Sequence, residues 1–488
     1  MNYKMVFRVQ SWILLIEALL MVPALVISLV TKDKPAVNGF VETMGLLVVL
    51  GALGILGTKS ADSRFYAPEG MLSTGLAWIS MSLLGGLPFC ISGRIPSFVD
   101  SFFEIVSGFT TTGASICPDV EALGYGLLFW RSFSHWVGGM GILVFFLAIV
   151  PVTGSNSGFT LHILRAESPG PEVNKMVPRM RDSAAILYAI YCALTVLNVI
   201  LLLVGQMPVF DAFCIAFGTA GTGGFSVLNS GCATYTPFAQ WVTTIFMFLF
   251  GVNFSLYYLL AVRRFKMVFR DEELRLYTGF VVLSTVLITI NVMANMPAGR
   301  ELGATIREAA FTVSSIITTT GYSMSDFNLW PSLSKTILVF LMFVGASAGS
   351  TGGGLKDIRF LILFKSVRRN VRHIFHPNEV QVVRINKQRV KEDTVTNVNE
   401  YLACYVLILV LSVFLISADP ANYGFETNFT AVMATLNNIG PGLADVGPMG
   451  NFAGYSDFSK LVLSFDMLVG RLEIFPILAL FSRSAYRK

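Results

Sequence analysis

The chain has 488 residues, of which 54% are hydrophobic and only 13% are charged, and its mean hydropathy is +0.66. Soluble proteins carry about 25% charged residues, so the deficit predicts that much of this chain faces lipid. The net charge of +5 does not indicate a nucleic-acid partner, because the basic residues stand in loops between apolar segments, and the six cysteines lack the spacing of a disulfide framework or a metal site.

Two apolar segments, near residues 10–30 and 40–57, open the chain. Each has about the 20 residues that a helix needs to cross a bilayer. The first is followed by charged residues without a clear cleavage site, which favours a retained span over a signal peptide. We expect residues 1–60 to form a peripheral two-helix hairpin.

The next unit, residues 61–152, combines full spans with a segment too short to cross. Residues 70–92 and 125–151 are long enough for membrane helices, whereas residues 96–109 are roughly half that length. The short segment leads into Thr110–Ser115, a run of three threonines followed by glycine. The expected order is therefore span, half-helix, string and span.

This order of parts recurs three times, in residues 153–262, 263–372 and 373–488. The expected helices are 183–205, 209–218 and 238–262, then 277–296, 303–317 and 334–366, then 400–417, 424–436 and 458–482. An interval of about 110 residues between strings indicates one structural unit used four times. The predicted fold is an all-α polytopic membrane protein, with four membrane-pore-membrane repeats around a pseudo-fourfold axis plus the N-terminal hairpin.

The four strings are the candidate ion-binding elements. Thr318–Ser323 nearly copies the first string, residues 219–226 are a looser copy, and residues 437–441 diverge most. A cation leaves water only where oxygens replace its hydration shell, and rings of backbone carbonyls bind it weakly enough for release. Glycine permits the required backbone angles. The candidate filter residues are Thr111, Thr112, Gly113, Thr222, Gly223, Thr319, Thr320, Gly321, Asn438, Ile439 and Gly440.

The distribution of charge predicts the orientation. Lysine and arginine gather at both termini and in the loops between repeats, at residues 165–181, 263–275 and 365–391, so these parts are expected in the cytoplasm. Acidic residues gather around the strings, where they form an outer mouth that concentrates cations or are solvated loop residues. They are Asp100, Glu104, Asp119, Glu121, Asp211, Asp326, Asp419, Glu426, Asp445 and Asp457.

A glycine-rich stretch, residues 345–356, interrupts the last span of the third repeat. Glycine costs about 1 kcal/mol against alanine inside a helix, so a continuous helix is not expected. A phosphate-binding loop does not fit, because Lys356 is displaced by one position and no strand precedes it. Close packing of small residues is one alternative, and a flexible loop that blocks the cavity is the preferred interpretation. The candidate gate residues are Gly345, Gly349, Gly352, Gly353, Gly354, Lys356 and Arg471.

Arg471 and Glu473 lie inside the last span. Charges at membrane depth usually face the bundle interior. Arg471 either bounds the ion path as a fixed positive charge or pairs with Glu473 or with carbonyls of another repeat. Arg131 and His135, in the second span of the first repeat, receive no role from the sequence.

Several runs together resemble the Trk/Ktr/HKT superfamily of potassium transporters, in particular its bacterial membrane subunits. They are the F-x-x-V-S-G-F-T-T-T-G-A-S run at 103–115, W-V-G-G-M-G-I at 136–142, A-E-S-P-G at 166–170, S-T-G-G-G-L-K at 350–356, and Arg471. The match covers nearly the whole chain.

The resemblance implies a potassium filter with Gly113, Gly223, Gly321 and Gly440, an intramembrane gating loop at 345–354, and Arg471 beside the gate. It also implies a homodimer and a cytosolic TrkA-like ring of nucleotide-binding regulatory subunits. In some plant relatives serine replaces the first filter glycine and sodium is preferred, so Gly113 favours potassium. The fourth string departs from the family pattern.

We expect a potassium-uptake channel or transporter, not an enzyme, in the bacterial inner membrane. K⁺ is the permeant ligand and no covalent cofactor is expected. The regulatory partner docks on the basic loops, which alternatively bind anionic membrane lipid. A sodium or non-selective cation transporter of the same fold is the nearest rival. An organic-solute carrier is the next, although it predicts inverted repeats. Channel conduction and proton-coupled symport stay open, as does the regulatory nucleotide.

Overall fold

The computed structural model describes residues 1–59, 66–141, 180–295, 300–379 and 381–481. Six helices in this part of the chain are long and apolar enough to cross a membrane, or seven if one sharply bent pair counts as a span. The expected fold class is confirmed: the protein is an all-α polytopic membrane protein. Residues 142–151 of the expected second span, the run at 166–170, the basic stretch at 165–179 and the basic C-terminal residues 483–488 lie outside the described ranges.

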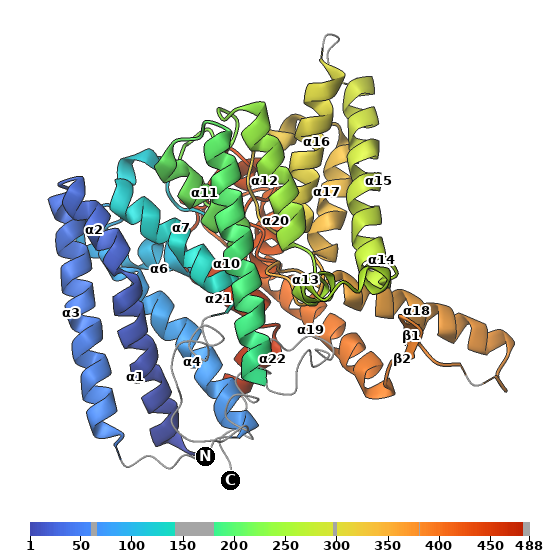
Figure 1. The fold of residues 1–488 in the computed structure, drawn as a ribbon, viewed down its shortest axis with the longest axis horizontal. Helices are drawn as coiled ribbons and strands as arrows, with labels where there is room; N and C mark the ends of the chain where they lie inside the picture. The colour runs from blue at the N-terminus through green and yellow to red at the C-terminus, as the bar shows by residue number, and fades with distance from the viewer. Residues whose placement is uncertain (60–65, 142–179, 296–299, 380, 482–488) are drawn as a thin grey trace.

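The N-terminal hairpin packs along one edge of the molecule (Figure 1). Its helices are α1 (Tyr3–Leu20), α2 (Val22–Val30) and α3 (Lys34–Gly57). The first two form one continuous span, Tyr3–Val30, because the chain passes from α1 to α2 at Met21 without leaving helical geometry. Asp33 caps α3 by accepting a hydrogen bond from the amide of Ala36.

The first two repeats follow in chain order. The first comprises α4 (Ala67–Gly85), α5 (Leu87–Ile91), the short helix α6 (Phe98–Phe109), the 3₁₀ turn η1 (Glu121–Leu123) and α7 (Tyr125–Gly139). The second comprises α10 (Met180–Val204), the short helix α11 (Val209–Gly221), α12 (Pro237–Phe250), α13 (Phe254–Ala261) and α14 (Phe265–Phe269).

The last two repeats keep the same order of parts. The third comprises α15 (Glu272–Asn295), the short helix α16 (Leu302–Ile317), η2 (Phe327–Leu329), α17 (Ser332–Val344) and α18 (Asp357–Phe375). The fourth comprises α19 (Glu392–Ile416), the short helix α20 (Phe425–Leu436), η3 (Ala444–Val446), α21 (Asp457–Arg471) and α22 (Phe475–Phe481).

The described chain contains one small sheet, a hairpin between α18 and α19 at the edge of the molecule opposite the N-terminal helices (Figure 1). Strands β1 (Arg384–Ile385) and β2 (Gln388–Arg389) are antiparallel and pair Arg384 with Arg389 and Ile385 with Gln388. The turn residues Asn386 and Lys387 both have positive φ, which is the geometry that closes a two-residue hairpin.

The second helix of the repeats is broken more often than the sequence predicts. The break at 345–356 was expected, but the continuous spans expected at 238–262 and 458–482 are wrong. Residues 251–253 separate α12 from α13 with a bend of 93°, and residues 472–474 separate α21 from α22. These breaks fall beside the short helices, so each one opens the backbone near the centre of the bundle.

The core is tightest around the four short helices. Side chains such as Phe103, Phe109, Phe311 and Val432 are fully buried, whereas the long helices α3, α10, α15 and α19 keep many exposed apolar side chains. Exposed apolar side chains on long helices suit a lipid-facing surface. The short helices are therefore shielded inside the protein, where their C-terminal ends need protein partners.

Candidate ion filter and gate

Each short helix ends in the same unusual backbone conformation. Just beyond the end of each short helix, a residue other than glycine adopts the left-handed backbone conformation. These residues are Thr111 (φ 56°), Thr222 (57°), Thr319 (58°) and Asn438 (54°). A glycine with positive φ follows two positions later in each string: Gly113 (81°), Gly224 (72°), Gly321 (80°) and Gly440 (99°). Four strings of different sequence thus share one backbone path.

The hydrogen bonds of the strings repeat as closely as their angles. The amide that follows the left-handed residue donates back to a carbonyl five residues earlier, which satisfies a carbonyl that the helix end would leave unpaired. The four bonds are Thr112 to Ser107 (2.9 Å), Gly223 to Gly218, Thr320 to Ser315 and Ile439 to Ala434 (2.8 Å each). This bond turns the chain out of the helix and directs it into the string.

The four strings close into a ring. A Cβ atom added to Gly113 would collide with the carbonyl oxygen of Gly223 in the next repeat. The same collision recurs for the other three glycines, each against the repeat that follows it, and the fourth string returns to the first. The pairs are Gly224 with Thr320, Gly321 with Ile439, and Gly440 with Thr112. Four carbonyls and four glycines therefore surround one axis.

The structure corrects the alignment of the second string with the other three, for which the sequence predicted Gly223. Gly224, and not Gly223, stands where Gly113, Gly321 and Gly440 stand. Gly223 occupies the position of Thr112, Thr320 and Ile439, and it supplies a carbonyl to the ring. The sequence suggested the wrong glycine because the second string has two adjacent glycines and a single threonine.

Side chains brace the strings in different ways. In the first and third strings, the hydroxyls of alternate threonines lie 2.8 Å apart, Thr110 with Thr112 and Thr318 with Thr320. In the fourth string, the Asn438 amide donates to the Thr112 hydroxyl at 3.0 Å and to the Met467 carbonyl at 2.8 Å. The divergent fourth string is thereby tied directly to the first.

Several of the expected outer-mouth carboxylates are buried or paired instead of facing solvent, and Glu104, Asp211 and Asp419 are all buried. Glu104 is fully buried and pairs with Arg131 (Nε to Oε1, 2.5 Å) behind the first string, where it also accepts from the amide of Ile116. Asp100 pairs with Lys460 at 2.5 Å. Among the described residues, the exposed members of the expected set include Asp119, Glu121, Asp445 and Asp457.

The outer loops of neighbouring repeats are joined by asparagines. Asn229 of the second repeat binds Asp119 (Nδ2 to Oδ1, 2.8 Å) and accepts from the amide of Val120 at 2.9 Å. Asn328 of the third repeat exchanges two such bonds with Ala444 of the fourth. The hydrogen bond from Asn229 lowers the pKa of Asp119, so this carboxylate stays charged at the rim.

The glycine-rich segment between α17 and α18 lies directly against the strings. The amide of Gly353 donates to the Thr319 hydroxyl at 2.6 Å. A Cβ on Gly352 would stand 2.9 Å from the carbonyl oxygen of Thr318, and one on Gly353 would collide with that of Asn437. Residues 345–356, which we call the gate loop, therefore run beneath the third and fourth strings.

The gate loop also occupies the break in the second repeat. The amide of Ser347 donates to the Gly251 carbonyl at 3.1 Å, and the amide of Phe254 donates to the Gly349 carbonyl at 3.0 Å. Gly345, Gly349 and Gly354 all have positive φ, which fits the expected loss of helix. The ammonium group of Lys356 donates to the Gly352 carbonyl within the loop.

Arg471 holds the gate loop against the first repeat. Its guanidinium donates to the carbonyl of Thr351 at 2.8 Å and to those of Gly138 and Gly139 at 2.6 and 2.7 Å. Of the partners considered for Arg471, the structure shows carbonyls of another repeat, and it adds a carbonyl of the gate loop. Glu473 instead forms an ion pair with Arg359, which also lies over the ring of Tyr401.

Two buried carboxylates that the sequence did not single out support the loop from below. Glu273 accepts from the amide of Ala348 at 2.6 Å, and Asp357 accepts from the hydroxyl of Ser347 at 3.1 Å. In the sequence, Glu273 is an acidic residue at the start of α15 and Asp357 follows the glycine-rich stretch. Neither position indicates that the carboxylate contacts the gate loop.

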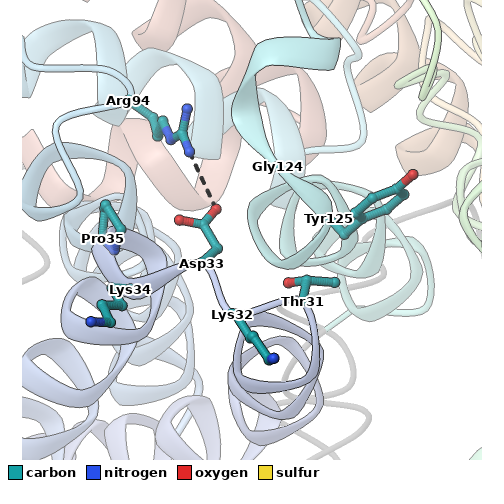
Figure 2. A pocket seen from close by; sticks show the side chains of 8 residues that line it. All are labelled: Thr31, Lys32, Asp33, Lys34, Pro35, Arg94, Gly124 and Tyr125. Atoms are coloured by element: carbon teal, nitrogen blue, oxygen red, sulfur yellow. Dashed lines mark hydrogen bonds and ion pairs between the residues drawn. The ribbon is translucent and has the colours of Figure 1, made fainter.

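A surface pocket at the tip of the N-terminal hairpin is distinct from this centre (Figure 2). It is an open depression of about 550 Å³, lined by residues 31–35, Arg94, Gly124 and Tyr125. Arg94 reaches Asp33 at 3.5 Å across it. None of its lining residues belongs to a string or to the gate loop, so the pocket is not part of the candidate ion path.

The chain matches a known protein family over most of its length. The model of the TrkH family, described as a cation transport protein, matches residues 38–486. The chain belongs to the TrkH cation transport family. The ring, the gate loop and Arg471 all fall within the matched range.

Relatives in the family align over their full length. The Trk system potassium uptake protein TrkH of Salmonella typhimurium is 34% identical over 494 residues, and TrkG of Escherichia coli is 29% identical over 490 residues, with 99–100% of each chain covered. The crystal structure of the potassium transporter TrkH from Vibrio parahaemolyticus superposes with a TM-score of 0.88 at 29% identity and covers 100% of both chains.

Proposed function

We propose that this chain is a potassium-selective channel or transporter that takes up K⁺ across the bacterial inner membrane through one pathway in each protomer. The observation that carries the proposal is the closed ring of string carbonyls, because carbonyl rings can replace the hydration shell of K⁺. The names of the relatives, potassium uptake proteins, support the same cation.

The proposed filter comprises the four strings. The ring carbonyls belong to Thr112, Gly223, Thr320 and Ile439, and the adjoining glycines leave room for them. The hydroxyl oxygen of Thr111 is buried without a hydrogen-bond partner in the described structure, so it is available to a bound ion. K⁺ is the cargo here, and the chemistry of binding is exchange of water oxygens for protein oxygens.

The gate loop controls this path in the proposal. It lies under two of the four strings, its glycines allow several backbone conformations, and Arg471 is the cation that fastens it. A cytosolic regulatory ring on the basic loops would shift the loop between closed and open positions. N- and C-termini in the cytoplasm and a homodimer complete this proposal, which the basic inter-repeat loops and the family membership support.

Recording from purified protein in planar bilayers tests the proposal. With KCl on one side and NaCl on the other, the reversal potential should lie close to the potassium equilibrium potential. Equal permeability would overturn the potassium claim in favour of the non-selective rival. With symmetrical KCl, a pH gradient that shifts the reversal potential would assign proton coupling, and an unshifted potential would assign a channel.

A further inference from the structure

His135 lies behind the filter, between two repeats. It belongs to α7 of the first repeat and is fully buried. Its Nδ1 stands 2.7 Å from the carbonyl oxygen of Gly108 in the first short helix, and its Nε2 is 3.3 Å from the amide of Phe225 in the second string. Because a carbonyl only accepts and an amide only donates, the imidazole is neutral, with its proton on Nδ1.

Arg131 lies one helical turn before His135 and binds Ser226, the residue after Phe225 in the second string. Its Nη1 donates to the carbonyl of Ser226 at 3.0 Å, and its guanidinium carbon lies 3.6 Å from the centre of the Phe225 ring. Glu104 fixes the other side of this guanidinium. Two side chains of the first repeat thus hold the segment that leaves the second string.

The second string lacks the brace that its neighbours have. The first and third strings use a pair of threonine hydroxyls, but the second has glycines, Gly221 and Gly223, at both positions of the pair. Gly223 is not among the residues with positive φ, so its backbone does not require glycine. A Cβ there would collide with the ring atoms of His135. The imidazole therefore fills the space that a threonine side chain would take.

We propose that His135 is a positioning residue of the filter: it replaces the missing threonine brace and holds the second string, including the ring carbonyl of Gly223, at the distance that K⁺ requires. Arg131 assists by anchoring Phe225 and Ser226. This inference rests on the proposed potassium function. A second string without its brace would let the ring close around a smaller ion, and discrimination against Na⁺ would fall while conduction persists.

A double-mutant cycle tests this role. His135→Ala removes the brace and Gly223→Thr adds a side chain that collides with the imidazole ring. The double variant places a threonine side chain in the space that the imidazole leaves. His135→Gln is the conservative control, since an amide both donates and accepts. Each protein is checked by size-exclusion elution and thermal unfolding, and its K⁺/Na⁺ permeability ratio is taken from bi-ionic reversal potentials. The rise in unfolding temperature produced by K⁺ and by Na⁺ reports binding preference without conduction.

His135→Ala should lower the K⁺/Na⁺ permeability ratio by about tenfold. Interaction energies between contacting residues are about 0.5–3 kcal/mol, and about 1.4 kcal/mol corresponds to a factor of ten. His135→Gln should keep it, and the double variant should recover most of what His135→Ala loses. A wild-type ratio in folded His135→Ala, or independent losses that simply add in the double variant, would overturn the inference. A wild-type protein that does not prefer K⁺ would overturn the proposed function itself, and the inference with it.

Discussion

The four strings and the gate loop are both glycine-rich, non-helical segments near the centre of the bundle, yet they are held in different ways. Each string repeats one pattern of angles and one backbone hydrogen bond to its own helix, and its glycine packs against the next string. The gate loop occurs once and depends on a few individual bonds, such as Gly353 to Thr319 and Arg471 to Thr351.

The comparison shows that glycine has a different role in the strings and in the gate loop. Glycine in the strings permits close approach, since a Cβ on Gly113, Gly224, Gly321 or Gly440 would meet a carbonyl of the neighbouring string. Glycine in the loop lowers the barrier between backbone conformations. The strings should therefore control which ion passes, and the loop how much passes.

Deleting Ala346–Gly353 should have the largest effect. A minor open state is commonly populated at about 0.1–10%, so removing the loop should raise basal K⁺ flux about tenfold to a thousandfold without altering selectivity. Flux into proteoliposomes measures it. Flux that stays low in folded, membrane-inserted protein would count against the loop as gate.

Gly113→Ser should alter selectivity instead of flux control. The serine Cβ would collide with the carbonyl of Gly223, and a non-glycine residue at φ 81° carries about 1–3 kcal/mol of strain. The K⁺/Na⁺ permeability ratio should fall by about tenfold or more, since 1.4 kcal/mol corresponds to a factor of ten. Unchanged competition between the two ions in uptake assays would contradict the filter assignment.

Arg471→Ala should loosen the loop without touching the strings. It removes the charged hydrogen bond to the Thr351 carbonyl of the loop, and such a bond contributes about 1.5–3 kcal/mol, so basal flux should rise by at least about tenfold with an unchanged permeability ratio. Arg471→Lys is the matched control. Lysine cannot span the Thr351, Gly138 and Gly139 carbonyls with a planar fork, so an intermediate flux is expected. A changed ratio would place Arg471 in the filter instead.

Asp419→Asn, remote from both regions, should have the smallest effect. Burial by itself raises the pKa of Asp419, but hydrogen bonds from Ser456 and its neighbours outweigh burial and hold the pKa at about 2. A lowered folded-state pKa stabilises the fold above the ordinary value of 3.8, and this stability disappears as pH falls toward 2.

Thermal unfolding between pH 2 and 7 measures this contribution. Asp419→Asn should lower the unfolding temperature at neutral pH by about 2 °C or less and remove this part of the acid dependence. Both flux and selectivity should match the wild type. A change in either would mean that the outer end of α19 is coupled to the strings.

The sequence predicted the elements that depend on local pattern. Apolar length located the long helices, and the recurring strings located the four short helices between them. It missed the breaks at 251–253 and 472–474, where a single polar or charged residue, Asn253 or Glu473, stands in a run long enough to be read as one span. Glu473 and Ile474 adopt positive φ without glycine, and the ion pair of Glu473 with Arg359, 114 positions away in the chain, helps to hold that break.

The sequence did contain a signal for the register of the second string. Gly224-Phe225-Ser226 matches Gly321-Tyr322-Ser323, a glycine followed by an aromatic residue and a serine, and the choice of Gly223 missed this match. The pairing of buried Glu104 with Arg131, 27 positions later, had no such local signal. Local preferences therefore gave the parts, while long-range partners determined the geometry of the site.

The ring has a direction: each glycine abuts the carbonyl of the repeat that comes next, never the one before. A larger side chain at one of these glycines should therefore displace the following string before the preceding one. The four strings therefore form a ring with a handedness of its own, although their backbone path is nearly fourfold.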